Sequence, residues 1–291
     1  LQQDPAYRLR TKRMKRRRAT RIRNQTLLFI GLALFTFVNL VPLIWAALTS
    51  IKSPADAFTV PPTILFQPTF EYHRQVWFER DFLRYLANSL IVSAGTVLIS
   101  VPIGSLAAYG LSRMPQRRAA PVLFGLFTVR MFPHMLLAIP FFVMGSFLGM
   151  IDTYPLLILA LVAINQPFTI WLMYSFFLDI PRDLDEAAAM DGCNLWQTFR
   201  IVILPLARPG LTVAALFSLL LSYNEFLFAL VLTGIRTKTL PVAIASFGGE
   251  DVSDWSISAA GAIGIMLPIV IVMIFVQRHL VRGLTIGAVK G

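Results

Sequence analysis

The chain has 291 residues, of which 56% are hydrophobic and only 14% charged, and its mean hydropathy is +0.69. This composition is far more apolar than that of an ordinary soluble domain, so lipid is the expected solvent for much of the surface. The formal net charge of +11 would suit a nucleic-acid-binding protein, and the positions of the basic residues therefore decide what the charge means.

Apolar stretches long enough to cross a bilayer recur along the chain, because a hydrocarbon core about 30 Å thick needs about 20 apolar residues per helix. The predicted spans are Leu27 to Leu48, Leu86 to Leu111, Pro121 to Leu148, Tyr154 to Leu178, Leu211 to Leu232 and Ala259 to Leu280. The predicted fold class is an all-α membrane protein with six transmembrane helices. It has a basic N-terminal tail (1–26), a transmembrane domain (27–280) and a C-terminal tail (281–291).

The basic residues separate between the two predicted faces of the membrane. Nineteen lie in the N-terminal tail and after the second, fourth and sixth spans, six lie in the loops on the opposite face, and Arg130 lies inside the third span. By the positive-inside rule, both termini and the segment after the fourth span are cytoplasmic. The run from Lys12 to Arg18 lacks interleaved aromatic residues and adjoins a span, which favours contact with anionic lipid over nucleic acid.

The segment between the fourth and fifth spans, Asp179 to Pro209, is longer than a plain connection requires. Pro181 is expected to end the preceding helix, and Asp183 to cap a new one, with Glu186 placed to complete a capping box. Alanines at 187–189 favour that helix and leave its surface open to close approach by another protein. The predicted element is therefore a short helix suited to docking.

Gly192 is expected to end this short helix and bend the chain. Asn194 can cap a second helix, in which Leu195, Phe199 and Val202 recur on one apolar face until Pro205 stops it. The segment as a whole is predicted to form a helix, a glycine bend and a second helix.

The spacing in this segment resembles the EAA loop of binding-protein-dependent ABC importer permeases. That pattern is Glu-Ala-Ala, three residues, Gly, nine residues, Ile, any residue and Leu-Pro. The matching residues here are Glu186, Ala187, Ala188, Gly192, Val202, Leu204 and Pro205, with valine in place of isoleucine. Asn224 to Phe226, the turn Leu148 to Thr153 and the C-terminus from Arg282 are similar to the maltose-type carbohydrate subfamily.

The resemblance implies that this loop supplies a coupling helix, which docks in a cleft of an ATPase subunit. It also implies that the chain lies in a bacterial or archaeal cytoplasmic membrane. The implied docking residues are Glu186, Ala187, Ala188, Asp191, Gly192, Lys290 and Gly291. The implied partners are a second permease subunit of different sequence, two ATPase subunits that bind ATP and Mg²⁺, and an extracytoplasmic solute-binding protein that delivers a sugar or oligosaccharide. The implied mechanism is alternating access.

Few polar residues lie within the predicted spans. Glu225 is the only acidic residue deep in a span, so it is expected to face the bundle interior, water or a partner, together with Asn224. Both are candidates for the translocation pathway, although a tie between helices would explain them as well. Arg130 could pair with Glu225 or lie at a cavity surface. Pro133, Pro140 and Pro268 lie within predicted spans and are expected to kink or interrupt their helices, although prolines are also simply commoner in membrane helices.

No sequence motif for nucleotide or metal chemistry is present. The sequence has no phosphate-binding loop, no nucleophile elbow and no zinc-protease motif, and Cys193 is its only cysteine. We therefore expect no catalytic residue, metal site or cofactor in this chain. The alternatives are a secondary transporter or channel, which would need its own ion-coupling residues, and an intramembrane enzyme, which would need paired catalytic groups.

Overall fold

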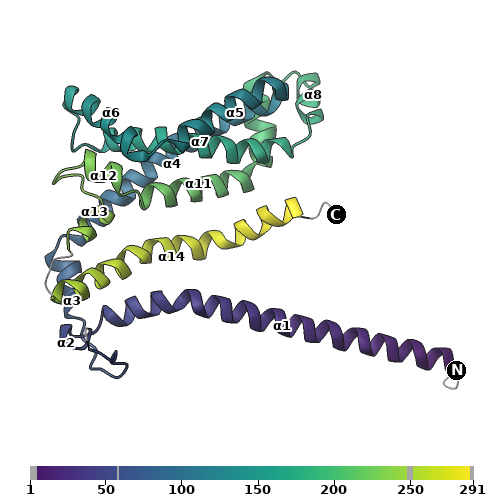
Figure 1. Ribbon diagram of the computed structural model, residues 1–291. Helices are drawn as coiled ribbons and strands as arrows, with labels where there is room; N and C mark the ends of the chain where they lie inside the picture. The colour runs from purple at the N-terminus through teal and green to yellow at the C-terminus, as the bar shows by residue number, and fades with distance from the viewer. Residues whose placement is uncertain (1–4, 58, 248–251, 289–291) are drawn as a thin grey trace.

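The computed structural model describes residues 5–57, 59–247 and 252–288, and every regular element in these ranges is helical. The elements, in chain order (Figure 1), are α1 (Pro5–Thr49), α2 (Pro54–Ala57), α3 (Glu71–Arg74), the π-helix η1 (Gln75–Glu79), α4 (Phe82–Arg113), α5 (Gln116–Met131), α6 (His134–Phe147), α7 (Tyr154–Leu178), α8 (Asp183–Met190), α9 (Leu195–Gln197), the π-helix η2 (Thr198–Ile203), α10 (Leu204–Leu206), α11 (Arg208–Tyr223), α12 (Leu227–Leu232), α13 (Leu240–Ala245) and α14 (Val252–Ala288).

Four of the described helices are long and apolar enough to cross a membrane: the part of α1 from Ile22 to Thr49, then α4, α7 and the part of α14 from Trp255 to Gln277. Two bent pairs raise the number to six if each pair is one span. The helical membrane fold is therefore confirmed. The first and last helices extend into the two predicted tails, since α1 is helical from Pro5 and α14 continues to Ala288.

Two predicted spans are not single helices. The third is broken into α5 and α6, which meet at 87°. Pro133 has no N–H group and forces the residue before it out of the helical region, so Phe132 is extended, with ψ 138°. The fifth is broken between Tyr223, where α11 ends, and Leu227, where α12 begins. The interruption is confirmed at Pro133, whereas Pro140 and Pro268 lie inside α6 and α14, which continue past them.

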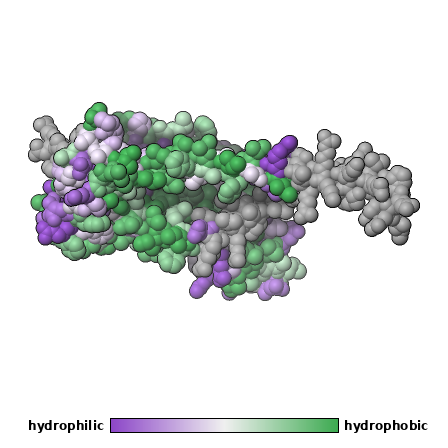
Figure 2. All heavy atoms as spheres, turned by 90° about the horizontal axis from the view of Figure 1, so that it is seen from below, coloured by the Kyte–Doolittle hydropathy of each residue, from purple (hydrophilic) through white to green (hydrophobic). Residues whose placement is uncertain are grey.

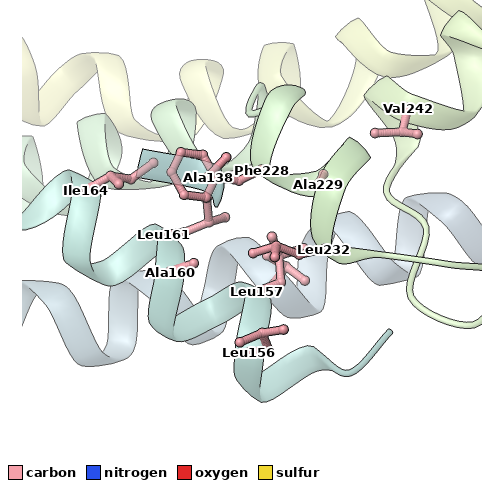
Figure 3. Close-up of a cluster of buried hydrophobic side chains, with 11 residues drawn as sticks. Ala138, Leu156, Leu157, Ala160, Leu161, Ile164, Phe228, Ala229, Leu232 and Val242 are labelled. Atoms are coloured by element: carbon pink, nitrogen blue, oxygen red, sulfur yellow. The ribbon is translucent and has the colours of Figure 1, made fainter. Parts of the chain in front are cut away.

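Helix α7 packs in the centre of the bundle. Its residues Leu157 and Leu161 are buried against the second halves of both broken spans, α6 and α12 (Figure 3). On the other side, a Cβ atom at Gly104 of α4 would lie 2.7 Å from the side chain of Thr169, so the two backbones approach closely. Small residues let helices pack in lipid, where apolar burial does not drive association.

Buried polar side chains join α4, α7 and α11. The Ser100 hydroxyl donates to Gln166 Oε1 at 2.9 Å, and the Asn165 amide donates to the Ser222 hydroxyl at 3.1 Å. Separating these helices would leave the polar groups without partners in an apolar medium. We therefore treat α4, α7 and α11 as one packed unit.

The outer surface carries the apolar side chains that a membrane would cover. None of the most apolar window of α1 is buried inside the chain. Figure 2 shows green, apolar atoms along the middle of one face and purple, hydrophilic atoms gathered toward its ends. In Figure 1 the start of α1, the end of α14 and α8 lie toward one end of the molecule, and α6 and α12 lie toward the other.

Candidate functional site

The short helix α8 begins one residue earlier than predicted, at the residue expected to cap it. Asp183 is the first helical residue, Arg182 occupies the N-cap position, and no side chain caps the helix. The predicted capping box of Asp183 and Glu186 is therefore wrong. Arg182 is instead held by the carbonyl of Ser112, to which it donates at 3.0 Å, and the acidic residues lie in the first turn. Negative charge there still favours the helix through its dipole.

Helix α8 ends in the bend predicted at Gly192. The N–H of Cys193 donates to the Ala188 carbonyl at 2.9 Å, and the N–H of Gly192 donates to the Ala189 carbonyl at 3.0 Å. This pair of bonds is a Schellman motif, which needs a left-handed residue at its corner. Gly192 has φ +84°, and a Cβ atom there would meet nothing within 4 Å. Backbone conformation, rather than space, requires glycine.

The second helix starts as predicted and ends later. The Asn194 carboxamide accepts from the N–H of Gln197 at 2.9 Å, and the Gln197 side chain accepts from the N–H of Asn194 at 2.9 Å, forming a capping box. The helix then continues through Pro205 to Leu206 before turning by 80° into α11. Pro205 does not stop the helix, because it lies in the first turn of α10, where a backbone N–H needs no partner within the helix.

An exposed ridge surrounds the Gly192 bend, and we call it the coupling ridge. It consists of Glu186, Ala187, Met190, Asp191, Gly192, Leu195 and Trp196. Ala188, in contrast, is only 5% exposed, so its side chain packs inside the chain and is not open to a partner. Apolar residues dominate the ridge, since Met190 is 88% exposed, Leu195 83% and Trp196 56%.

The sequence did not identify the apolar part of this ridge. The predicted apolar face of Leu195, Phe199 and Val202 does not pack as a unit: Phe199 is buried, Val202 half-buried and Leu195 exposed. The π-helical turn that begins at Thr198 widens the helix and changes the angular spacing between side chains. Of the other predicted docking residues, Lys290 and Gly291 lie outside the described residues.

Glu225 and Asn224 lie at the break between α11 and α12. The Glu225 carboxylate accepts from the N–H groups of Leu227 and Phe228 at 3.1 and 3.2 Å, which caps the start of α12. Asn224 is exposed and donates to the Leu220 carbonyl at 2.9 Å. Glu225 therefore has a structural role at the break, whatever its part in transport.

The breaks in the third and fifth spans lie beside each other. The ring of His134, the first residue of α6, is 6.2 Å from the ring of Phe228 near the start of α12. Arg130 lies over the ring of Phe168 at 5.0 Å, and no ion pair between Arg130 and Glu225 is found among the described side chains. Interrupted helices of this kind line substrate sites in many transporters.

At the end of the molecule opposite α8, Asp152 organises the loop 233–239. Its carboxylate accepts from the N–H groups of Gly234, Arg236 and Thr237 at 2.9 to 3.0 Å, and from the Thr237 hydroxyl at 2.7 Å. Burial alone would raise the pKa of Asp152, but these donors outweigh it and hold the pKa well below its ordinary value. Asn88 of α4 also donates to two carbonyls of the loop.

Replacing Asp152 by asparagine is expected to loosen the loop 233–239. The new amide would face at least one N–H donor, and a buried donor without a partner costs about 1–3 kcal/mol. Hydrogen exchange of the loop should therefore become faster, whereas Arg236→Gln, which removes a guanidinium whose side chain is 72% exposed, should change little. Unchanged protection in Asp152→Asn would contradict this role.

The pH dependence of this loop follows from the lowered pKa of Asp152. A carboxyl whose pKa is lower in the folded state contributes stability above its ordinary pKa, near 3.8, and loses it as the pH falls through the folded value. Between about pH 8 and pH 5, loop protection corrected for intrinsic exchange should therefore stay constant.

The family model for the binding-protein-dependent transport system inner membrane component matches residues 100–286, which include α8, the Gly192 bend and both helix breaks. The chain belongs to this family. This permease is also 37% identical over 258 residues to the trehalose transport system permease protein SugB of Mycobacterium tuberculosis, covering 87% of this chain and 93% of that one.

Two further relatives agree in length and architecture. The trehalose/maltose transport system permease protein MalG of Thermococcus litoralis is 36% identical over 270 residues, with 91% of this permease and 96% of the relative covered. A chain of a bacterial ABC transporter involved in the import of the polysaccharide alginate has a similar structure, with TM-score 0.68, 26% identity and coverage of 90% and 96%. The chain is therefore a permease subunit of an ABC transporter, in which ATP hydrolysis belongs to a separate subunit.

Proposed function

We propose that this permease subunit imports a carbohydrate delivered by an extracytoplasmic solute-binding protein. The observation that carries the proposal is its similarity over nearly the whole chain to permeases named for trehalose and maltose transport. A neighbour in structure, 15% identical with TM-score 0.63, comes from an alginate ABC transporter in complex with a pentasaccharide-bound periplasmic protein. That complex supports a binding protein as the source of substrate.

An ATPase dimer is the proposed partner of the coupling ridge, and the ATPase subunits would bind ATP and Mg²⁺. The ridge is exposed, apolar at its centre and acidic at Glu186 and Asp191, so it fits an apolar cleft with basic residues at its rim. The excess of basic residues toward this end supports a cytoplasmic position for α8 and both termini, in a bacterial or archaeal cytoplasmic membrane.

A second permease subunit is proposed to complete the pathway. Many apolar side chains of α5 and α6 are exposed, including Met131 (83%), Phe124 (75%) and Phe147 (88%), and lipid or another permease must cover them. Asn224, exposed beside the adjacent helix breaks, is the proposed contact for a polar solute. Closure of the ATPase dimer would favour an outward-facing cavity, and hydrolysis would return it to the inward-facing state.

The test is purification of the assembled complex, followed by reconstitution in vesicles with its binding protein. Among a panel of mono-, di- and oligosaccharides, at least one is expected to stimulate ATP hydrolysis and to accumulate inside. Solute movement by this chain without ATPase subunits, driven by an ion gradient, would contradict the proposal.

A further inference from the structure

A clamp of three side chains joins the coupling segment to the membrane helices. Arg113, at the end of α4, forms an ion pair with Asp185 of α8 at 2.8 Å, and the Tyr109 hydroxyl donates to the same carboxylate. The guanidinium also lies over the Tyr109 ring at 5.3 Å. The charged side chains of Arg113 and Asp185 are only 18% and 21% exposed, so water screens their interaction weakly.

The same guanidinium reaches the end of α7. Arg113 Nη1 donates to the carbonyl of Phe177 at 3.1 Å and to that of Ile180 at 3.4 Å. Carbonyls at a helix C-terminus lack partners within the helix and carry the negative end of its dipole, which favours a cation there. One arginine therefore holds the ends of α4 and α7 and the first turn of α8 together.

The second half of the coupling segment is fixed to the same helices by apolar contacts. Phe199 of η2 is 5% exposed, and its ring lies 5.2 Å from Tyr109 and 6.4 Å from Phe177. Ile203, farther along η2, is completely buried in the same cluster. Both sides of the Gly192 bend are thus attached to α4 and α7, which the polar contacts at Ser100 join to each other.

We propose that Asp185 and Arg113 are positioning residues that make the coupling ridge move as one body with α4 and α7. The inference rests on the proposed function, in which an ATPase subunit binds the coupling ridge and displaces it. A displacement of a small helix reaches the membrane helices only through a stiff link, and the partly buried ion pair, together with the charge-assisted hydrogen bond from Tyr109, supplies it. Without the Asp185 carboxylate, α8 can move with the ATPase subunit while α4 and α7 do not move.

The decisive variant is Asp185→Asn, tested in the complete reconstituted transporter. Asparagine keeps the shape and an acceptor for Tyr109 but removes the negative charge opposite Arg113. The ATPase subunits should still co-purify, because the ridge is unchanged, and carbohydrate uptake per ATP hydrolysed should fall about fivefold or more. Asp183→Asn is the matched control, since it removes an exposed carboxylate from the same turn, and it should couple normally. Asp185→Glu should restore part of the coupling.

A distance measurement tests the link independently of transport. In a Cys193→Ser background, which removes the only cysteine, spin labels at Met114→Cys and Ala189→Cys report the separation of α4 and α8. The distance distribution should be narrow with Asp185 and broad with Asp185→Asn.

Normal uptake per ATP together with an unchanged distribution in Asp185→Asn would overturn the clamp and leave the proposed function intact. Loss of the ATPase subunits from Asp185→Asn would also overturn it, because Asp185 would then be needed for assembly. Equal uncoupling by Asp183→Asn would overturn it as well, because the effect would then come from surface charge. An unmodified complex that moves no carbohydrate would refute the proposed function, and the label distances would still decide the clamp.

Discussion

Replacing Gly192 by valine is expected to leave the permease inserted in the membrane but to uncouple it from ATP hydrolysis. The residue at this corner has φ +84°, a conformation that costs an ordinary L-residue about 1–2 kcal/mol and a β-branched one more. Because a Cβ atom meets nothing there, the cost falls on the bend itself. The equilibrium ratio of bent to unbent chains should fall about 5- to 30-fold, and uptake should fall with it.

The measurement is uptake and sugar-stimulated ATP hydrolysis in vesicles that contain equal amounts of inserted protein. Gly192→Asn is the matched control, because asparagine tolerates the left-handed region and should retain most of the activity. Equal uptake by the valine and glycine proteins would show that the Gly192 bend does not hold the coupling ridge in its working form.

Acidic substitutions on the apolar part of the coupling ridge are expected to detach the ATPase subunits. Met190 and Leu195 are 88% and 83% exposed on either side of the bend, in the position of interface anchors. Truncating such an anchor typically costs about 2 kcal/mol, or about thirtyfold in Kd, and burying an unpaired carboxylate costs more. The double variant Met190→Asp/Leu195→Asp should therefore purify without ATPase.

Ile235→Asp is the control for this double variant. Ile235 is 79% exposed in the loop that Asp152 organises, at the other end of the molecule, so an acidic residue there should leave ATPase binding unchanged. Retention of the ATPase by the ridge double variant would mean that the motor docks elsewhere.

Short-range interactions were sufficient to predict the bend and the helix cap of the site from the sequence. Gly192 and Asn194 act through bonds that span only a few residues, so a glycine corner and a capping box could be predicted from spacing alone. The helix break at Pro133 follows from the missing N–H of proline in the same way. The break at 224–226 has no proline, and there the Glu225 carboxylate replaces the interrupted backbone bonds.

Contacts between distant parts of the chain could not be predicted. Arg113 and Asp185 lie more than seventy residues apart, and nothing in their sequence spacing indicates that they form a pair. Asp183 was a reasonable cap by residue type, but the tie of Arg182 to the end of α4 determines where α8 begins. The burial of Ala188 beside the exposed Ala187 likewise depends on how α8 packs against the bundle.

Site-specific photo-crosslinking in the assembled complex tests the central claim, that the ridge around Gly192 receives a separate ATPase subunit. A crosslinker in place of Ala187, which is exposed on α8, should yield an adduct with the ATPase, and one in place of Ile235 should yield none. An ATPase adduct from Ile235 and none from Ala187 would contradict the account.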